Sequence, residues 1–262
     1  MARNYSACRV GKRCSGVCFL LMLAGPALAG PPFITDDPEP VDLGQWEVYG
    51  FSAGAAGKGA VSGLGPSMEA DYGAATGLQL HVAGGFSYEG RRDGTFVMGI
   101  SDTELGAKLR LLKSDENEWY PQLGVYPLIE VPTGNARRGL GAGYWQEFLP
   151  LWLQKDWGAW STHGGGGYWI NPGPGNRNFW FVGWLLQRHV TDFLELGGEV
   201  FHQTSSMEGQ RASSGFNLSG MYNFTPHNHL LFALGRGGIL YAVDSAVVGY
   251  PTTYYIAYQW TS

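Results

Sequence analysis

The sequence predicts an all-β fold, an antiparallel transmembrane β-barrel of about 12 strands with short periplasmic turns and long extracellular loops. Three observations predict it: polar and apolar residues alternate, the connections alternate in length, and aromatic residues gather near the predicted strand ends. The 262 residues include 41 glycines and few apolar runs with helical spacing, which favours strands over helices. A chain of this length is more consistent with one barrel than with two domains.

Residues 102–111 show the alternation most clearly. Asp102 and Lys108 fall on one face of this stretch, while Leu105 and Leu109 fall on the other. Successive side chains of a strand point to opposite faces, so one face is charged and the other apolar. Because a soluble β-sandwich alternates in the same way, the fold class depends on how many such strands there are and how they are joined.

Twelve strands are predicted, and their connections alternate in length. The strands cover residues 45–54, 67–74, 77–88, 101–112, 121–131, 147–155, 159–170, 178–189, 193–204, 214–224, 229–236 and 252–260. Short turns at 75–76, 155–158, 191–192 and 225–228, and a longer polar link at 113–120, follow the even strands; glycine-rich loops at 55–66, 89–100, 132–146, 171–177 and 237–251 follow odd strands. This pattern is typical of outer-membrane barrels and places both ends of the barrel on the periplasmic side.

The lengths of the strands and the positions of the aromatic residues agree with a membrane-spanning barrel. The predicted strands run from 8 to 12 residues, and a tilted strand needs about 9–11 residues to cross a bilayer. Trp119, Trp157, Trp180 and Trp260 lie near strand ends. Amphipathic rings prefer the level of the lipid headgroups, so these residues predict two aromatic girdles.

Some features conflict with regular strands. Pro127 and Pro150 lie within predicted strands, and each lacks the N–H that a ladder needs, so they predict bulges or displaced boundaries. The four glycines at 164–167 predict a weak strand unless a bulky neighbour packs against their backbone. Residues 179–186 are apolar on both faces, so their inward and outward positions are undetermined.

Residues 1–29 are expected to be a cleaved secretory signal. Four basic residues precede an apolar run at 17–24, and Ala27 and Ala29 supply the small residues that a signal peptidase requires. The run is shorter than the roughly 20 residues of a spanning helix. The three cysteines, Cys8, Cys14 and Cys18, all lie in this signal, which excludes disulfides and thiolate metal sites from the mature chain.

The expected mature chain is acidic. Removing the four basic residues of the signal from the 17 in the sequence leaves 13 against 22 acidic residues, a net charge near −9. This charge argues against binding to nucleic acid or to anionic lipids. No later stretch reaches about 18 consecutive apolar residues, which excludes a helical inner-membrane protein.

The mature chain is expected to divide into two parts. Residues 30–44 form a periplasmic N-terminal segment, and residues 45–262 form the transmembrane barrel. Asp36, Asp37 and Glu39 lie between prolines in the segment. The segment could cap or plug the periplasmic mouth of the barrel, or it could be a plain tether.

Several motifs are similar to a known family. The motifs are residues 32–40 (PFITDDPEP), 102–108 (DTELGAK), 131–134 (VPTG), 164–173 (GGGGYWINPG) and 198–204 (GEVFHQT). They resemble the outer-membrane transporter family associated with the meta-pathway of phenol degradation, over nearly the whole mature chain. The resemblance implies a barrel that moves small molecules. Barrels of this kind usually end on an aromatic residue that the insertion machinery reads, whereas here Thr261 and Ser262 follow Trp260.

The alternation also predicts which residues line the lumen. The polar candidates are Glu47, Glu69, Asp71, Gln79, His81, Asp102, Glu104, Lys108, Arg110, Glu130, Glu195, Glu199 and Gln203, and the aromatic candidates are Tyr49, Tyr126, Trp152 and Tyr255. These residues could form a polar pore whose charges select the solute, or an ion-pair network that fills the barrel. The excess of carboxylates disfavours anions. We therefore expect a channel or porin-like transporter that passes small, uncharged or aromatic solutes by passive diffusion.

An enzyme is the competing class of function. Some outer-membrane barrels hydrolyse lipids, and a Ser–His pair on the outer surface would indicate a phospholipase or a lipid A deacylase. His202 with Ser205 or Ser206, and His163 with Ser161, are the local candidates, and both histidines are predicted to face outward. A closed structural barrel is the third possibility.

No cofactor and no metal ion are expected. His227 and His229 could hold a metal, but a solvated periplasmic turn is the simpler interpretation. The expected partners are outer-membrane lipids, the barrel assembly machinery during biogenesis and a small-molecule solute, with no nucleic acid. The expected location is the outer membrane of a Gram-negative bacterium.

Overall fold

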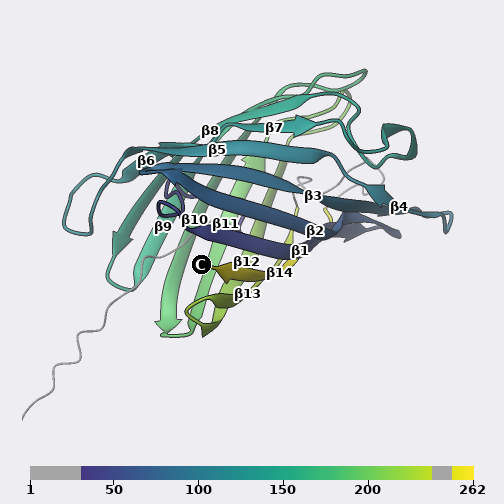
Figure 1. Cartoon of the computed structure of the whole chain (residues 1–262). Helices are drawn as coiled ribbons and strands as arrows, with labels where there is room; N and C mark the ends of the chain where they lie inside the picture. Colours follow the sequence, from purple (N-terminus) through teal and green to yellow (C-terminus); the bar gives the residue numbers. More distant parts are fainter. Residues whose placement is uncertain (1–30, 238–249) are drawn as a thin grey trace, which may run out of the picture.

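The described residues form a closed antiparallel barrel (Figure 1). The computed structural model describes residues 31–237 and 250–262, so the expected signal at 1–29 and most of the expected loop at 237–251 lie outside the described residues. Within these ranges, no helix is long and apolar enough to cross a membrane.

The barrel has twelve strands along the described residues, and two of them are interrupted. The elements are β1 (Trp46–Gly57), β2 (Ala60–Ala75), β3 (Leu78–Gly90), β4 (Phe96–Ile100), β5 (Thr103–Leu112), β6 (Gln122–Val125), β7 (Leu128–Val131), the 3₁₀ turn η1 (Ala136–Arg138), β8 (Gln146–Trp157), β9 (Trp160–Ile170), β10 (Phe179–Thr191), β11 (Leu194–Gln203), β12 (Ser213–Thr225), β13 (Asn228–Arg236) and β14 (Thr252–Thr261). β4 and β5 both pair with β3, and β6 and β7 both pair with β5 and β8, so each couple is one barrel strand. β1 pairs with β14 and closes the cylinder.

The prediction of long glycine-rich loops was wrong at two places. Residues 55–66 and 89–100 are not open loops but tall hairpins, because β1 and β2 join through Lys58-Gly59 and β3 continues to Gly90 before β4 begins. Glycine in these stretches permits close packing of a neighbouring strand. A Cβ on Gly63 would lie 2.6 Å from the Tyr88 hydroxyl oxygen. Glycine at this position therefore reflects crowding within a paired sheet and not an irregular chain.

The two strand prolines lie at one break in the sheet. β6 ends before Tyr126-Pro127, and the partners of β6 and β7 on β8 leave out Leu149 and Pro150. The ladder between β8 and the strand formed by β6 and β7 therefore leaves out both prolines at the same level of the barrel. Because proline has no N–H to donate, this arrangement confines the loss of ladder hydrogen bonds to one place.

The four-glycine run forms part of a continuous strand, β9, with bulky neighbours. Gly165 pairs with Trp152 of β8 and with Gly183 of β10. A Cβ on Gly165 would lie 2.2 Å from the Leu151 carbonyl oxygen and 2.9 Å from the Trp152 ring. The Trp152 ring thus packs against the bare backbone of β9, and a larger side chain in β9 would displace the ring.

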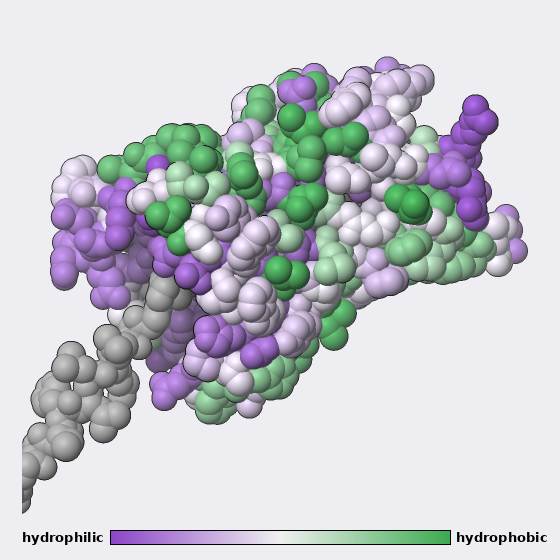
Figure 2. All heavy atoms as spheres, in the orientation of Figure 1, coloured by the Kyte–Doolittle hydropathy of each residue, from purple (hydrophilic) through white to green (hydrophobic). Residues whose placement is uncertain are grey.

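The two faces of the sheet have opposite character. Large apolar side chains such as Leu80, Leu151, Trp184, Leu218 and Ile256 are exposed on the outer face, while charged and amide side chains are buried inside. Figure 2 shows hydrophobic side chains over the strands and hydrophilic ones gathered at the two ends. This is the distribution that a lipid bilayer requires of a barrel.

Aromatic side chains pair at both rims of the outer face. Trp46 packs on Tyr72 with ring centroids 4.6 Å apart near the short turns, and Tyr168 packs on Trp180 at 4.9 Å near the loops. Residues 179–186, which the sequence left undetermined, place Phe181 inside and Trp184 outside.

Replacing Gly165 with valine is expected to destabilise the barrel by about 1–3 kcal/mol, because the added side chain overpacks the contact with Leu151 and Trp152. Urea unfolding in lipid vesicles measures this change. Gly50 is a matched control, since a Cβ there meets nothing within 4 Å. An equal loss of stability in Gly165→Val and Gly50→Val would contradict the close-packing argument.

Candidate functional site

The N-terminal segment, residues 31–42, lies inside the barrel. It contacts β3 and β5 on one wall through Gln79 and Lys108, and β11 on another wall through Glu199. Figure 1 shows this purple stretch between the near strands, β1 to β3, and the far strands, β9 to β11. The described part of the segment that we expected in the periplasm therefore crosses the interior, in the half of the barrel nearest the short turns.

One end of the crossing is held by ion pairs with β5. The Lys108 ammonium donates to the carboxylates of Asp36 at 3.0 Å and Asp37 at 3.3 Å. Arg110, two residues along the same face, lies 3.3 Å from Glu39. Lys108 is 5% exposed. Both sequence-predicted cations, Lys108 and Arg110, are thus paired with the segment.

Burial changes the acidity of these carboxyl groups. It raises the pKa of Asp37 well above its usual range, against the opposing effect of the Lys108 ammonium. Burial also raises the pKa of Glu39, and here the Arg110 guanidinium opposes the shift. A bound proton can therefore relieve the repulsion among the carboxylates that share Lys108.

The other end of the crossing is held by Glu199 on β11. Its carboxylate accepts hydrogen bonds from the backbone N–H of Ile34 at 2.9 Å and of Thr35 at 2.8 Å, and from the Asn217 side chain at 2.7 Å. Glu199 is 2% exposed, and its charge is satisfied by three donors. Gly183 on β10 allows this approach, because a Cβ there would lie 2.2 Å from the Thr35 hydroxyl oxygen.

The remaining space beside the segment is small. Two cavities of about 10 and 30 Å³ lie next to it, the first by Phe33 and the second by Asp36 and Glu39. Sites for drug-sized ligands measure about 300–1,000 Å³. A solute of that size fits in neither of these cavities.

Aromatic side chains fill the far side of the interior. The aromatic cluster consists of Tyr126, Phe148, Trp152, Trp169, Phe179, Phe181 and Phe201, and Ile34 of the segment packs against it. Phe148 stacks on Trp169 with ring centroids 4.8 Å apart, and Phe181 lies 6.2 Å from Phe201. The Nε1 donors of Trp152 and Trp169 are buried and have no hydrogen-bond partner among the described residues.

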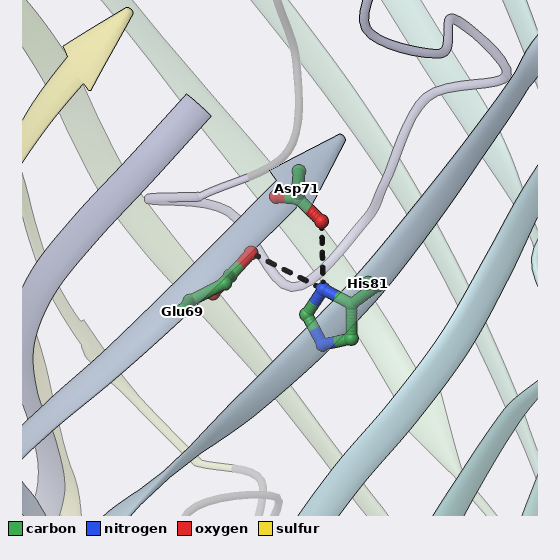
Figure 3. A group of neighbouring side chains, drawn as sticks. All are labelled: Glu69, Asp71 and His81. Atoms are coloured by element: carbon green, nitrogen blue, oxygen red, sulfur yellow. Dashed lines mark hydrogen bonds and ion pairs between the residues drawn. The ribbon is translucent and has the colours of Figure 1, made fainter. Parts of the chain in front are cut away.

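Carboxylates surround a histidine on the near side of the interior. His81 of β3 is directly opposite Asp71 of β2, and its Nδ1 lies 2.8 Å from Asp71 Oδ1 and 3.7 Å from Glu69 Oε1. Its Nε2 lies 3.0 Å from Glu104 Oε1 on β5. Figure 3 shows Glu69 and Asp71 pointing from one strand at the same ring nitrogen.

The structure gives each sequence-predicted lumen residue a buried or half-buried position. Buried are Tyr49, Asp71, Gln79, His81, Lys108, Tyr126, Trp152, Glu195, Glu199, Gln203 and Tyr255, and half-buried are Glu47, Glu69, Asp102, Glu104, Arg110 and Glu130.

These residues differ in the contacts that they make. Glu47 accepts hydrogen bonds from Tyr49 and Gln259, and Glu195 lies 3.3 Å from His189. Asp102 interrupts the ladder between β4 and β5 and accepts backbone hydrogen bonds from Gly134 and Ala142 in the following loop. Asp102 therefore anchors a loop.

The Ser–His pairs do not form a catalytic triad within the described residues. The prediction that His163 faces outward was wrong, because His163 is 1% exposed and lies inside, 2.8 Å from Ser161. Asp156 accepts a hydrogen bond from Ser161, and the His163 Nδ1 has no partner in the described chain, so no carboxylate orients the base. His202 does face outward, but it contacts Ser214 and not Ser205 or Ser206.

Most of the aromatic cluster was missed by the sequence reasoning. Phe179 and Phe181 lie in the stretch that is apolar on both faces, and Trp169 follows a glycine run that carries no side chain to reveal its phase. The tryptophans at 160 and 169 lie on opposite faces of β9. The positions of polar residues in the sequence therefore could not show which of these two tryptophans faces the interior.

Comparison with solved structures agrees with this architecture. The chain is similar to the COG4313 outer membrane channel from Pseudomonas putida F1, with a TM-score of 0.65 and 17% identity over 86% of this chain and 98% of that one. It is also similar to the NanC porin, with a TM-score of 0.57 and 8% identity over 82% of this chain and 98% of that one. At these identities the likeness shows the fold, which is that of outer-membrane barrels. No protein-family model and no curated protein sequence matches the chain.

Replacing Lys108 with methionine is expected to destabilise the protein by about 3–5 kcal/mol, because buried carboxylates of Asp36 and Asp37 lose their cation. Urea unfolding measures the loss, and limited proteolysis measures the release of residues 31–42. The control Lys155→Met removes an ammonium that donates hydrogen bonds to carbonyls in the link before β6 and not to the segment. If both variants release the segment equally, Lys108 does not hold it.

Proposed function

We propose that this protein is an outer-membrane channel that passes small solutes by passive diffusion. The observation that supports it most directly is the segment at 31–42, which is held across the lumen by polar contacts at Lys108, Arg110 and Glu199. A barrel built only as a scaffold gains stability from an apolar filling at lower cost than from buried charges. Ion pairs and charge-assisted hydrogen bonds can break and re-form with water, so they suit a plug that shifts to open the path.

The lumen favours a solute with an aromatic ring and a hydrogen-bonding oxygen. The aromatic cluster offers ring faces, and the Trp152 and Trp169 Nε1 groups offer donors that lack a partner in the described residues. Carboxylates on the opposite side, including Glu69 and Asp71, repel anions. Neutral phenolic compounds combine these properties, which agrees with the resemblance to transporters associated with the meta-pathway of phenol degradation.

Export and assembly complete the proposal. The chain reaches the outer membrane through cleavage of a signal at residues 1–29 and insertion by the barrel assembly machinery. Residues 45–262 then contact outer-membrane lipids through their apolar outer face. The polar residues among the sequence-predicted lumen residues, apart from Asp102, act as the polar and charged lining of the solute path.

Releasing the segment is expected to open the channel. In a planar bilayer, the wild type should show small, cation-selective single-channel currents. The double variant Lys108→Gln with Glu199→Gln should show currents several-fold larger, because both anchoring points of the segment lose their charge.

The matched control for this experiment is Glu89→Gln, which changes a 1% exposed carboxylate that pairs with Arg91 in the tall hairpin and does not contact the segment. The control should conduct like the wild type. No current from either the wild type or the double variant would refute the channel and favour a closed structural barrel.

The aromatic cluster is expected to bind the solute as it passes. Catechol should block the ion current of the wild type at lower concentration than that of Trp152→Leu, by about 2–10-fold, which is the worth of one aromatic contact. Trp184→Leu changes a tryptophan on the outer face and serves as the control. Equal block in all three proteins would show that the cluster does not contact the solute.

A further inference from the structure

The histidine and carboxylates on the near side of the interior lie close enough together to bind an ion, beyond their effect on passing solutes. We propose that Glu69, Asp71 and His81 bind one divalent transition-metal ion, Zn²⁺. The three residues come together because Asp71 and His81 are directly opposite in the β2–β3 ladder and Glu69 lies two residues along the same face. Their ligand atoms all lie within 4.8 Å of one another.

The spacing of these atoms is close to that of a tetrahedral site. Zinc binds imidazole nitrogen and carboxylate oxygen at about 2.0–2.2 Å, so neighbouring ligand atoms are about 3.4 Å apart. His81 Nδ1 lies 3.7 Å from Glu69 Oε1 and 2.8 Å from Asp71 Oδ1 (Figure 3). Small rotations of the two carboxylates admit the ion between them.

Glu104 prepares the histidine as a ligand. Its Oε1 lies 3.0 Å from His81 Nε2, so the neutral ring can donate its proton there and leave the Nδ1 lone pair for an ion bound between His81, Glu69 and Asp71. Metal-binding histidines commonly carry a carboxylate on the second nitrogen in this way, which orients the ring and raises its basicity.

The local charge also calls for a cation. Glu69, Asp71 and Glu104 contact His81, and Glu130 lies directly opposite Glu104 in the β5–β7 ladder. Even a protonated His81 leaves an excess of negative charge, and like charges in register destabilise a sheet. The nearby Lys108 ammonium binds Asp36 and Asp37.

A cavity provides the fourth ligand. The space of about 30 Å³ beside the segment reaches Glu69 and Asp71, and it can hold one or two waters. Tyr126 lines the same cavity and is 7% exposed. A metal-bound water in this space would complete the coordination.

The donor set favours zinc over calcium or magnesium. The hard cations Ca²⁺ and Mg²⁺ take oxygen ligands in sites of six or more, whereas an imidazole with carboxylates suits zinc and its neighbours. The site needs no thiolate.

Calorimetric titration of Zn²⁺ into the full mature chain, purified without an affinity tag and freed of metal in detergent micelles, tests the proposal. The wild type should bind one ion. His81→Gln should abolish binding, and Glu104→Gln should weaken it by about 10–100-fold, because Glu104 acts through His81. His163→Gln is the control, since His163 is an equally buried interior histidine that contacts Ser161.

Substitution with Co²⁺ adds a readout that a structural role would not move. Four-coordinate cobalt in the wild type should give an intense visible spectrum, and His81→Gln should lack it. Asp71→Asn is measured in parallel in case His81→Gln does not fold. The proposal fails if the wild type takes up no Zn²⁺ saturably, or if folded His81 and Asp71 variants bind it as the wild type does. Neither result decides whether the protein conducts, which the planar-bilayer currents test separately.

Discussion

The rest of the structure depends on one constraint, that backbone N–H and C=O groups facing hydrocarbon must find their partners within the protein. The pairing of β1 with β14 meets it by closing the sheet, so the first and last described strands leave no free edge toward each other's side. The same constraint explains where irregularity is tolerated. Pro127 and Pro150 share one gap in the ladder, and the break between β4 and β5 falls where Asp102 accepts hydrogen bonds from the loop after β7.

A closed sheet of this size leaves an interior that side chains of the wall alone do not fill, and the N-terminal segment occupies part of it. Its two halves match the two sides of the lumen. Ile34 packs against the aromatic cluster, while Asp36, Asp37 and Glu39 meet Lys108 and Arg110. Packing and charge therefore position the segment together.

The two-residue alternation of polar and apolar residues predicted which side chains point into the barrel. This prediction failed in stretches where the alternation is absent. The alternation in residues 102–111 predicted Glu104, Lys108 and Arg110 on the inner face, and the structure gives each of them a buried or half-buried position. His163 and Trp169 flank four glycines whose missing side chains hide the phase, and residues 179–186 are apolar on both faces, so the aromatic cluster was mostly missed. The meeting of His81 with Asp71 and Glu104 depends on the register between strands, which one strand's pattern does not contain. The position of the segment depends on long-range ion pairs.

The covalent connection between the segment and β1 has a consequence for how this protein can be assembled and labelled. β14 is the last strand along the chain, so the seam with β1 can form only after every other strand has been delivered. Residues 31–42 are attached to the β1 side of that seam and are enclosed as it shuts. Ser262 lies exposed at the rim, where it bonds to Trp46 and Gln45, and offers a position for a label that leaves the interior undisturbed.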